Sequence, residues 1–163
     1  MNAALLSSEK MDWETPDNIL ELVREFNGGR IGFDPCTTSR NPCDADMFIC
    51  PPGSAFQTEW HGYGLVYCNP PYGRELASWA RKMAHSGNAV TRSAEIIGLV
   101  PARPDTRWWH ENIVSAHAIC FWRGRLKFKG APASAPFPSA LPYWGPRPAR
   151  FREVFGPHGW IVT

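Results

Sequence analysis

One stretch decides the fold around the most informative feature of this chain, the turn at residues 69–72. It reads Gly64-Leu65-Val66-Tyr67-Cys68-Asn69-Pro70-Pro71-Tyr72. Residues 64–68 form a short apolar run, which predicts a buried strand. Two consecutive prolines can neither continue a strand ladder nor start a regular helix inside a loop. We therefore expect the chain to leave the sheet after Cys68 in a stiff, extended turn.

The turn at residues 69–72 gathers three groups that suit a flat ring carrying an amino group. The Asn69 side-chain oxygen and the Pro70 carbonyl can accept the two hydrogens of that amino group, and the Tyr72 ring can stack on its plane. A turn with a purely structural role would more cheaply use Asn-Gly or Pro-Asp-Gly. We interpret residues 69–72 as a catalytic loop.

The elements upstream of this turn are short. Thr15-Pro16-Asp17 predicts a helix start with Thr15 as the N-cap, and helical apolar spacing continues to Phe26 before Gly28-Gly29 ends the helix. Strands are expected at residues 30–35 and near 47–49, with loop in most of 36–63.

The elements downstream alternate between helix and strand. Helices are expected at 76–87 and at 106–114, the second capped by Asp105, and strands at 95–100, 141–144 and 160–163. Residues 116–121 and 125–129 predict a β-hairpin around Arg123-Gly124. This alternation predicts an α/β sheet that is mostly parallel, with a late antiparallel hairpin. Because ligands bind beyond the carboxyl ends of such strands, Asp34-Pro35 and Asn69-Pro70 are expected to share one crevice.

Length and composition narrow the class of protein. A chain of 163 residues with 44% hydrophobic content predicts a single domain, with residues 1–12 flexible and residues 131–142 as a proline-rich loop. The formal charge is only +2, so nucleic-acid binding would need a local basic patch. The odd cysteine count, with no signal peptide or long apolar stretch, favours a reduced cytoplasmic protein. Cys36, Cys43 and Cys50 lack zinc-ligand spacing, so no metal is expected.

Several shorter motifs have a structural alternative when each is taken alone. Asp34-Pro35 is a common turn dipeptide, and Trp13-Glu14-Thr15-Pro16 is a good helix start. Residues 103–106 could be a capped helix with a solvated arginine, and residues 124–128 an amphipathic edge strand.

The order of these motifs is more specific than any one of them. The series resembles the small phage- and prophage-encoded DNA N6-adenine methyltransferases, and the resemblance covers about Trp13 to Ser139. It rests on Trp13-x-Thr15-Pro16, Asp34-Pro35, Asn69-Pro70-Pro71-Tyr72, Pro101-Ala102-Arg103-x-Asp105-Thr106-x-Trp108-Trp109, Gly124-Arg125-Leu126-Lys127-Phe128 and Ala135-Pro136-Phe137-Pro138-Ser139.

This resemblance implies a compact, abbreviated Rossmann-like methyltransferase sheet that uses S-adenosyl-L-methionine. It implies three groups of site residues. The catalytic loop would be Asn69, Pro70, Pro71 and Tyr72; the cofactor contacts would be Trp13, Thr15, Pro16, Asp34, Pro35 and Cys36; the DNA contacts would be Arg103, Asp105, Thr106, Arg125, Lys127 and Phe128, with Phe128 as a second aromatic on the base.

The part of the fold that usually holds the cofactor's adenosine is shortened. Only about thirty residues separate Asp34 from the strand at 64–68, too few for two full strand–helix units. Asp44, Asp46 and Phe48 are the open alternatives for the ribose and adenine contacts.

The resemblance implies methyl transfer to N6 of an adenine flipped out of DNA in the bacterial host cytoplasm, without metal or covalent intermediate. Because no separate target-recognition domain follows the core, we expect a short recognition sequence or relaxed specificity. Alternatives that keep the turn are methylation of RNA adenine or of a protein glutamine, and a nucleic-acid-binding module that has lost turnover. A role in restriction–modification would suit such a family.

Overall fold

One eight-stranded sheet organises the part of the chain that the computed structural model describes, residues 13–51 and 53–163. The expected flexible segment 1–12 lies outside the described residues. The strands are β1 (Phe33–Asp34), β2 (Met47–Phe48), β3 (Leu65–Cys68), β4 (Glu95–Gly98), β5 (Val100–Pro101), β6 (Ala118–Trp122), β7 (Ser139–Trp144) and β8 (Gly159–Val162). Their order is β2-β1-β3-β4-β7-β6-β8, with β5 also paired to β7.

The first half of the sheet is parallel and contains a change of direction in the strand order. β1 pairs with β2 on one side and with β3 on the other, and β3 pairs with β4. The chain therefore moves outward from β1 to β2 and then crosses back to β3. Crevices open at such a point, outside the carboxyl ends of the strands. Asp34 ends β1 and Asn69 follows β3, so this crevice is where the sequence places them.

The second half of the sheet is antiparallel. Together with the parallel first half, it confirms the predicted fold class, a mostly parallel α/β sheet with an antiparallel hairpin. The predicted hairpin arms are wrong, however. β6 pairs with β7 and β8, and residues 125–129 form only an isolated bridge, from Lys129 to Glu14. These residues do alternate between exposed and buried as expected, because an extended segment can bury one face on the core without joining a ladder.

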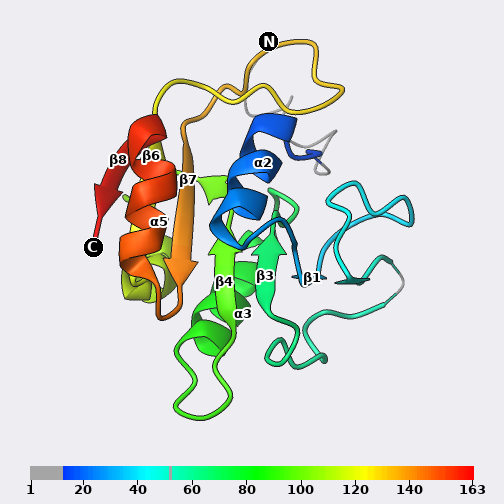
Figure 1. Cartoon of the computed structure of the whole chain (residues 1–163). Coiled ribbons are helices and arrows are strands. Elements are labelled where there is room, and N and C mark those ends of the chain that lie inside the picture. Colours follow the sequence, from blue (N-terminus) through cyan, green and yellow to red (C-terminus); the bar gives the residue numbers. More distant parts are fainter. Residues whose placement is uncertain (1–12, 52) are drawn as a thin grey trace.

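Helices cover both faces of the sheet (Figure 1). α2 (Asp17–Phe26) and α5 (Pro148–Phe155) pack together on one face, and α3 (Leu76–Gly87) packs with α4 (Arg107–Asn112) on the other. Short 3₁₀ turns follow two of them, η1 (Ile113–Ser115) and η2 (Gly156–His158). No helix within residues 13–51 and 53–163 is long and apolar enough to cross a membrane.

Two further expectations need correction. The proline-rich loop ends at Pro138, because residues 139–142 belong to β7, where Pro142 pairs with Ile119. α4, the helix expected at 106–114, begins after Thr106 rather than after Asp105. The Thr106 hydroxyl donates a hydrogen bond to the Arg103 carbonyl at 2.7 Å.

Candidate active site

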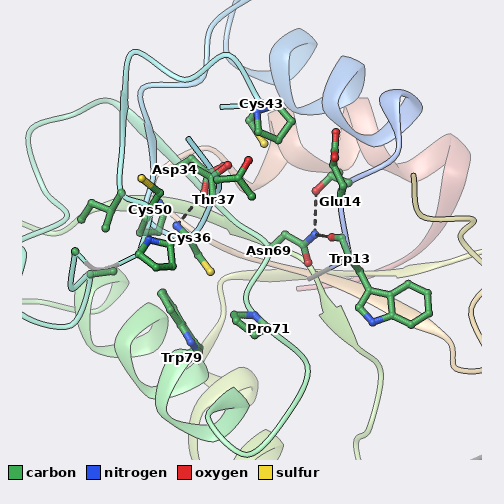
Figure 2. Close-up of a pocket in the computed structure, with 18 of the residues that line it drawn as sticks. Trp13, Glu14, Asp34, Cys36, Thr37, Cys43, Cys50, Asn69, Pro71 and Trp79 are labelled. Carbon is green, nitrogen blue, oxygen red and sulfur yellow. Dashed lines mark hydrogen bonds between the residues drawn. The ribbon is translucent and has the colours of Figure 1, made fainter. Parts of the chain in front are cut away.

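A cavity of about 580 Å³ opens where β1 and β3 end (Figure 2). This size lies within the range of ligand pockets in proteins, roughly 300–1,000 Å³. It brings together residues that the sequence assigned to the site, from both the expected cofactor group and the catalytic loop. They are Trp13, Thr15, Asp34, Pro35, Cys36, Asn69 and Pro71. Pro16 and Pro70 are buried beside them and do not line the cavity.

Asp34 places a carboxylate in the wall of this cavity. It ends β1 and is only 2% exposed. Burial raises the pKa of the Asp34 carboxyl, and hydrogen bonds from the Cys36 backbone N–H and the Cys43 and Thr37 side chains partly offset this rise. The Cys36 N–H donates to Oδ1 at 3.0 Å, so the carboxylate is oriented although little water reaches it.

Asn69 is the most constrained polar side chain of the loop. Its Nδ2 donates to the Trp13 carbonyl at 2.6 Å and to the Thr15 hydroxyl at 3.1 Å. Its Oδ1 is buried and has no hydrogen-bond partner in the structure. A buried acceptor without a partner costs about 1–3 kcal/mol, so such an atom in a binding cavity is a candidate ligand contact.

Thr15 does not cap the helix, contrary to the expectation. Pro16 stands at the N-cap position of α2, and no side chain caps that end. The Thr15 hydroxyl instead shares a hydrogen bond with the Tyr67 hydroxyl at 2.9 Å and accepts one from Asn69. The local pattern correctly predicted that a helix starts here. The Thr15 hydroxyl, however, binds residues that are distant in the sequence instead of capping the helix.

Tyr72 is buried next to the cavity rather than lining it. It is 9% exposed, and its hydroxyl donates to the Leu99 carbonyl at 3.0 Å. Its ring lies edge-to-face with Phe128 and Phe137, at centroid distances of 6.0 and 5.5 Å, and Trp13 packs edge-to-face against the same two phenylalanines. Three segments far apart in sequence, at Trp13, at Tyr72 and between β6 and β7, therefore meet next to residues 69–72.

The expected DNA contacts lie at the same edge of the sheet. Arg103, Asp105, Arg125 and Lys127 are exposed, Thr106 is half-buried, and Phe128 is 1% exposed. Arg103 follows β5, and residues 125–128 lie in the connection from β6 to β7, which crosses above α2 in Figure 1. None of Arg103, Arg125 and Lys127 has an ion-pair partner within the described part of the chain.

Two aromatic residues of the cavity wall were missed by the sequence reasoning. Trp79 on α3 is 6% exposed and has a buried indole N–H without a partner, and Phe56 lies 4.6 Å from it between ring centroids. The helical spacing that placed Trp79 in the core carried no sign that this residue also lines a cavity. By contrast, none of Asp44, Asp46 and Phe48 lines the cavity, and Asp46 is paired with Arg30.

No cluster of three or more His, Cys, Asp or Glu side chains suited to a metal ion occurs among residues 13–51 and 53–163.

Comparison with known families gives this geometry its context. Residues 2–139 match a family described as DNA N-6-adenine-methyltransferase (Dam). The chain belongs to this family. A search of curated proteins found no match. Membership of the Dam family confirms the predicted resemblance. The activity of this family is DNA adenine N6 methylation.

Proposed function

We propose that this chain transfers a methyl group from S-adenosyl-L-methionine to N6 of an adenine that is flipped out of DNA. The observation that carries the proposal is the Asn69 carboxamide. Both of its hydrogens are bound by the chain's own acceptors, and its oxygen is the one polar atom of that side chain without a partner. An acceptor held in this way matches a donor on the substrate, and the N6 amino group of adenine is such a donor.

The loop at residues 69–72 has to orient a weak nucleophile, the N6 amino group of adenine. The lone pair of adenine N6 is delocalised into the ring. Hydrogen bonds from N6 to the Asn69 oxygen and the Pro70 carbonyl favour a more tetrahedral nitrogen, whose lone pair is then available in line with the methyl group. Positioning and fixed dipoles contribute most of the acceleration, and the proton can leave to solvent after transfer, so no strong general base is required.

The residues present fit the cofactor. S-adenosyl-L-methionine supplies an electrophilic methyl on a sulfonium and leaves as a neutral thioether. The cationic amino acid suits the Asp34 carboxylate, and a flat purine suits the wall formed by Phe56 and Trp79, whose indole N–H still lacks an acceptor. Pro35 and Cys36 complete the expected contacts on the same wall.

The base has to be admitted to the loop. An adenine in a duplex hides N6 in its base pair, and flipping costs a few kcal/mol. Stacking on an aromatic ring offsets about 1–3 kcal/mol of this cost. The Asn69 oxygen is covered in the structure and Tyr72 is enclosed by Phe128 and Phe137, so flipping requires side chains around the loop to move apart. We assign Tyr72 as the stacking ring and Phe128 as the second aromatic once this has happened.

The DNA-facing edge supports a short or relaxed target sequence. The exposed groups assigned to DNA come from two connections, after β5 and between β6 and β7. Contacts from a few cations go mainly to phosphates, which position the duplex without reading its sequence. A role in modifying DNA against host restriction would suit relaxed specificity.

Replacing Asn69 tests the proposal directly. We expect Asn69→Ala to lower methyl transfer to DNA by at least about 100-fold, because one oriented acceptor is worth about 10²–10³ in rate. S-adenosyl-L-methionine binding, measured by calorimetry, should change little. Transfer of a labelled methyl group to DNA, followed by digestion to nucleosides, identifies the product. Asn88→Ala is the matched control, because Asn88 is exposed at the end of α3 and donates only to Ser115.

The same assay separates the alternatives. Label in N6-methyldeoxyadenosine supports the proposal, whereas label in RNA adenosine or in protein glutamine would transfer the same chemistry to another acceptor. Near wild-type transfer by Asn69→Ala would remove Asn69 from the mechanism. Cofactor binding with no transfer to any acceptor would favour a binding module.

A further inference from the structure

The orientation of the Asn69 amide is set by residues that the sequence assigned to the cofactor. Figure 2 shows Asn69 with Trp13 on one side and Asp34 and Cys36 on the other. The Trp13 carbonyl can only accept a hydrogen bond, so the amide nitrogen must face it, at 2.6 Å. The Thr15 hydroxyl accepts the second hydrogen at 3.1 Å. With both hydrogens held, the oxygen is turned to the opposite side.

The Thr15 hydroxyl is itself held in place. It lies 2.9 Å from the Tyr67 hydroxyl, and the two residues are 3% and 0% exposed, so water does not compete for the bond. Burial keeps the pKa of Tyr67 well above its ordinary value, and its hydroxyl therefore remains protonated at any working pH. Tyr67 belongs to β3, two positions before Asn69, so the hydroxyl pair ties the segment before α2 to the strand that carries the loop.

The backbone around Trp13 and Thr15 is also fixed. Pro16 is buried and stands at the start of α2, and the Lys129 N–H donates to the Glu14 carbonyl at 3.0 Å. The two acceptors that hold Asn69 therefore belong to a segment that is itself held, at Glu14 and at Pro16.

From this we infer that Thr15, backed by Tyr67, is a positioning residue for the methyl transfer. Its hydroxyl keeps the Asn69 amide turned so that the oxygen, and not the NH₂ group, meets the amino group of the acceptor base. This inference rests on the proposed function. A half-turn of the amide would set donor against donor and abolish the contact. The role differs from the expected cofactor contact, because it affects the turnover step and leaves cofactor affinity unchanged.

Four variants test the inference. Thr15→Val keeps the shape and removes the hydroxyl, and Thr15→Ser keeps a hydroxyl. Tyr67→Phe keeps the ring and removes only the partner of Thr15. Thr91→Val is the matched control, because Thr91 is exposed in the turn from α3 to β4 and does not line the cavity.

We expect Thr15→Val to lower kcat by about 10–100-fold, the usual effect of removing a group that orients a functional ligand. The KM for DNA and the Kd for S-adenosyl-L-methionine should stay within about threefold. Thr15→Ser should restore most of kcat, and Tyr67→Phe should lose less than Thr15→Val. Adding Tyr67→Phe to Thr15→Val should cause little further loss, because both act through one amide.

A measurement that does not depend on turnover tests the inference even where a variant is inactive for another reason. In ¹⁵N-labelled protein, the Asn69 side-chain amide hydrogens should exchange with solvent faster in Thr15→Val and in Tyr67→Phe than in the wild type. Unchanged exchange in both would overturn the inference. So would wild-type kcat in any folded variant that lacks the Thr15 hydroxyl, or a tenfold weaker cofactor Kd with unchanged kcat. A wild-type protein that methylates no DNA would instead contradict the proposed function.

Discussion

Asp34 combines a place in the cavity wall with a cost to folding. Among the described residues, it is the only Asp, Glu, Lys, Arg or His side chain that is almost fully buried. Burial raises the pKa of its carboxyl above the ordinary value, so the native state binds the proton more tightly than the unfolded chain does. The resulting contribution to stability is present below the unfolded pKa and is lost as the pH rises through the raised native pKa.

Asp34→Asn should therefore gain free energy of unfolding relative to the wild type as the pH is raised from about 4, the ordinary pKa of an aspartate, towards neutrality. Urea unfolding of both proteins across this range measures the difference. The same variant should bind S-adenosyl-L-methionine more weakly, and wild-type affinity should fall as acid protonates the carboxyl. A stability difference that stays constant with pH would show that Asp34 keeps an ordinary pKa.

At the scale of elements, the site depends on how closely β1 approaches the chain before β3. The Gly32 N–H donates to the Leu65 carbonyl at 2.9 Å, and a Cβ added at Gly32 would collide with the Tyr63 backbone carbonyl. A backbone atom cannot move aside as a side chain does, so β1 would be displaced. Since Asp34 ends β1, the cavity wall would move with it.

Gly32→Ala should lower the free energy of unfolding by at least about 1–3 kcal/mol and weaken cofactor binding. Gly156→Ala is the control, because Gly156 has a helical backbone, with φ −55° and ψ −40°, and a Cβ there would meet only the Ile161 side chain at 4.0 Å. That substitution should be neutral or stabilise the protein by up to about 1 kcal/mol. Equal effects of the two would contradict the close packing of β1 on residues 63–65.

At the scale of the whole molecule, positive charge gathers at the edge of the sheet that carries the site. The net formal charge is only +2, yet Arg103, Arg125 and Lys127 lie at this edge without ion-pair partners in the described residues. Arg107 and Lys129 are paired with Glu111 and Asp17 and are less available. Binding to DNA should therefore depend on few phosphate contacts.

We expect Arg125→Gln and Lys127→Gln each to reduce the slope of log K against log salt by about 1, with similar effects on unrelated DNA sequences. Fluorescence anisotropy with a labelled duplex at several salt concentrations measures the slope. Arg92→Gln is the control, because Arg92 lies in the turn from α3 to β4 at the opposite edge of the sheet. A slope lowered as much by Arg92→Gln would place the DNA elsewhere.

Local pattern was sufficient for much of the fold. α2 and α3 begin and end close to where proline, glycine and apolar spacing predict, because those signals act within one or two turns of chain. α5 was missed, although Pro148 in its first turn and the spacing of Phe151, Val154 and Phe155 are helical signals. The arms of the predicted antiparallel hairpin were wrong, because alternation indicates a buried face and does not indicate which strand pairs with it.

The sequence by itself determined which chemical groups residues 69–72 present. Fixed proline backbone angles, a missing N–H and an amide are properties of the residues themselves, and a buried strand before them places the turn at a sheet edge. Only the tertiary structure decided what holds that amide. Thr15 and Asn69 are 54 positions apart, and their contact exists because packing sets the start of α2 against β3. A local pattern spans only a few residues and carries no signal of this contact, so a threonine that looks like a helix cap proves to be a hydrogen-bond partner of Asn69.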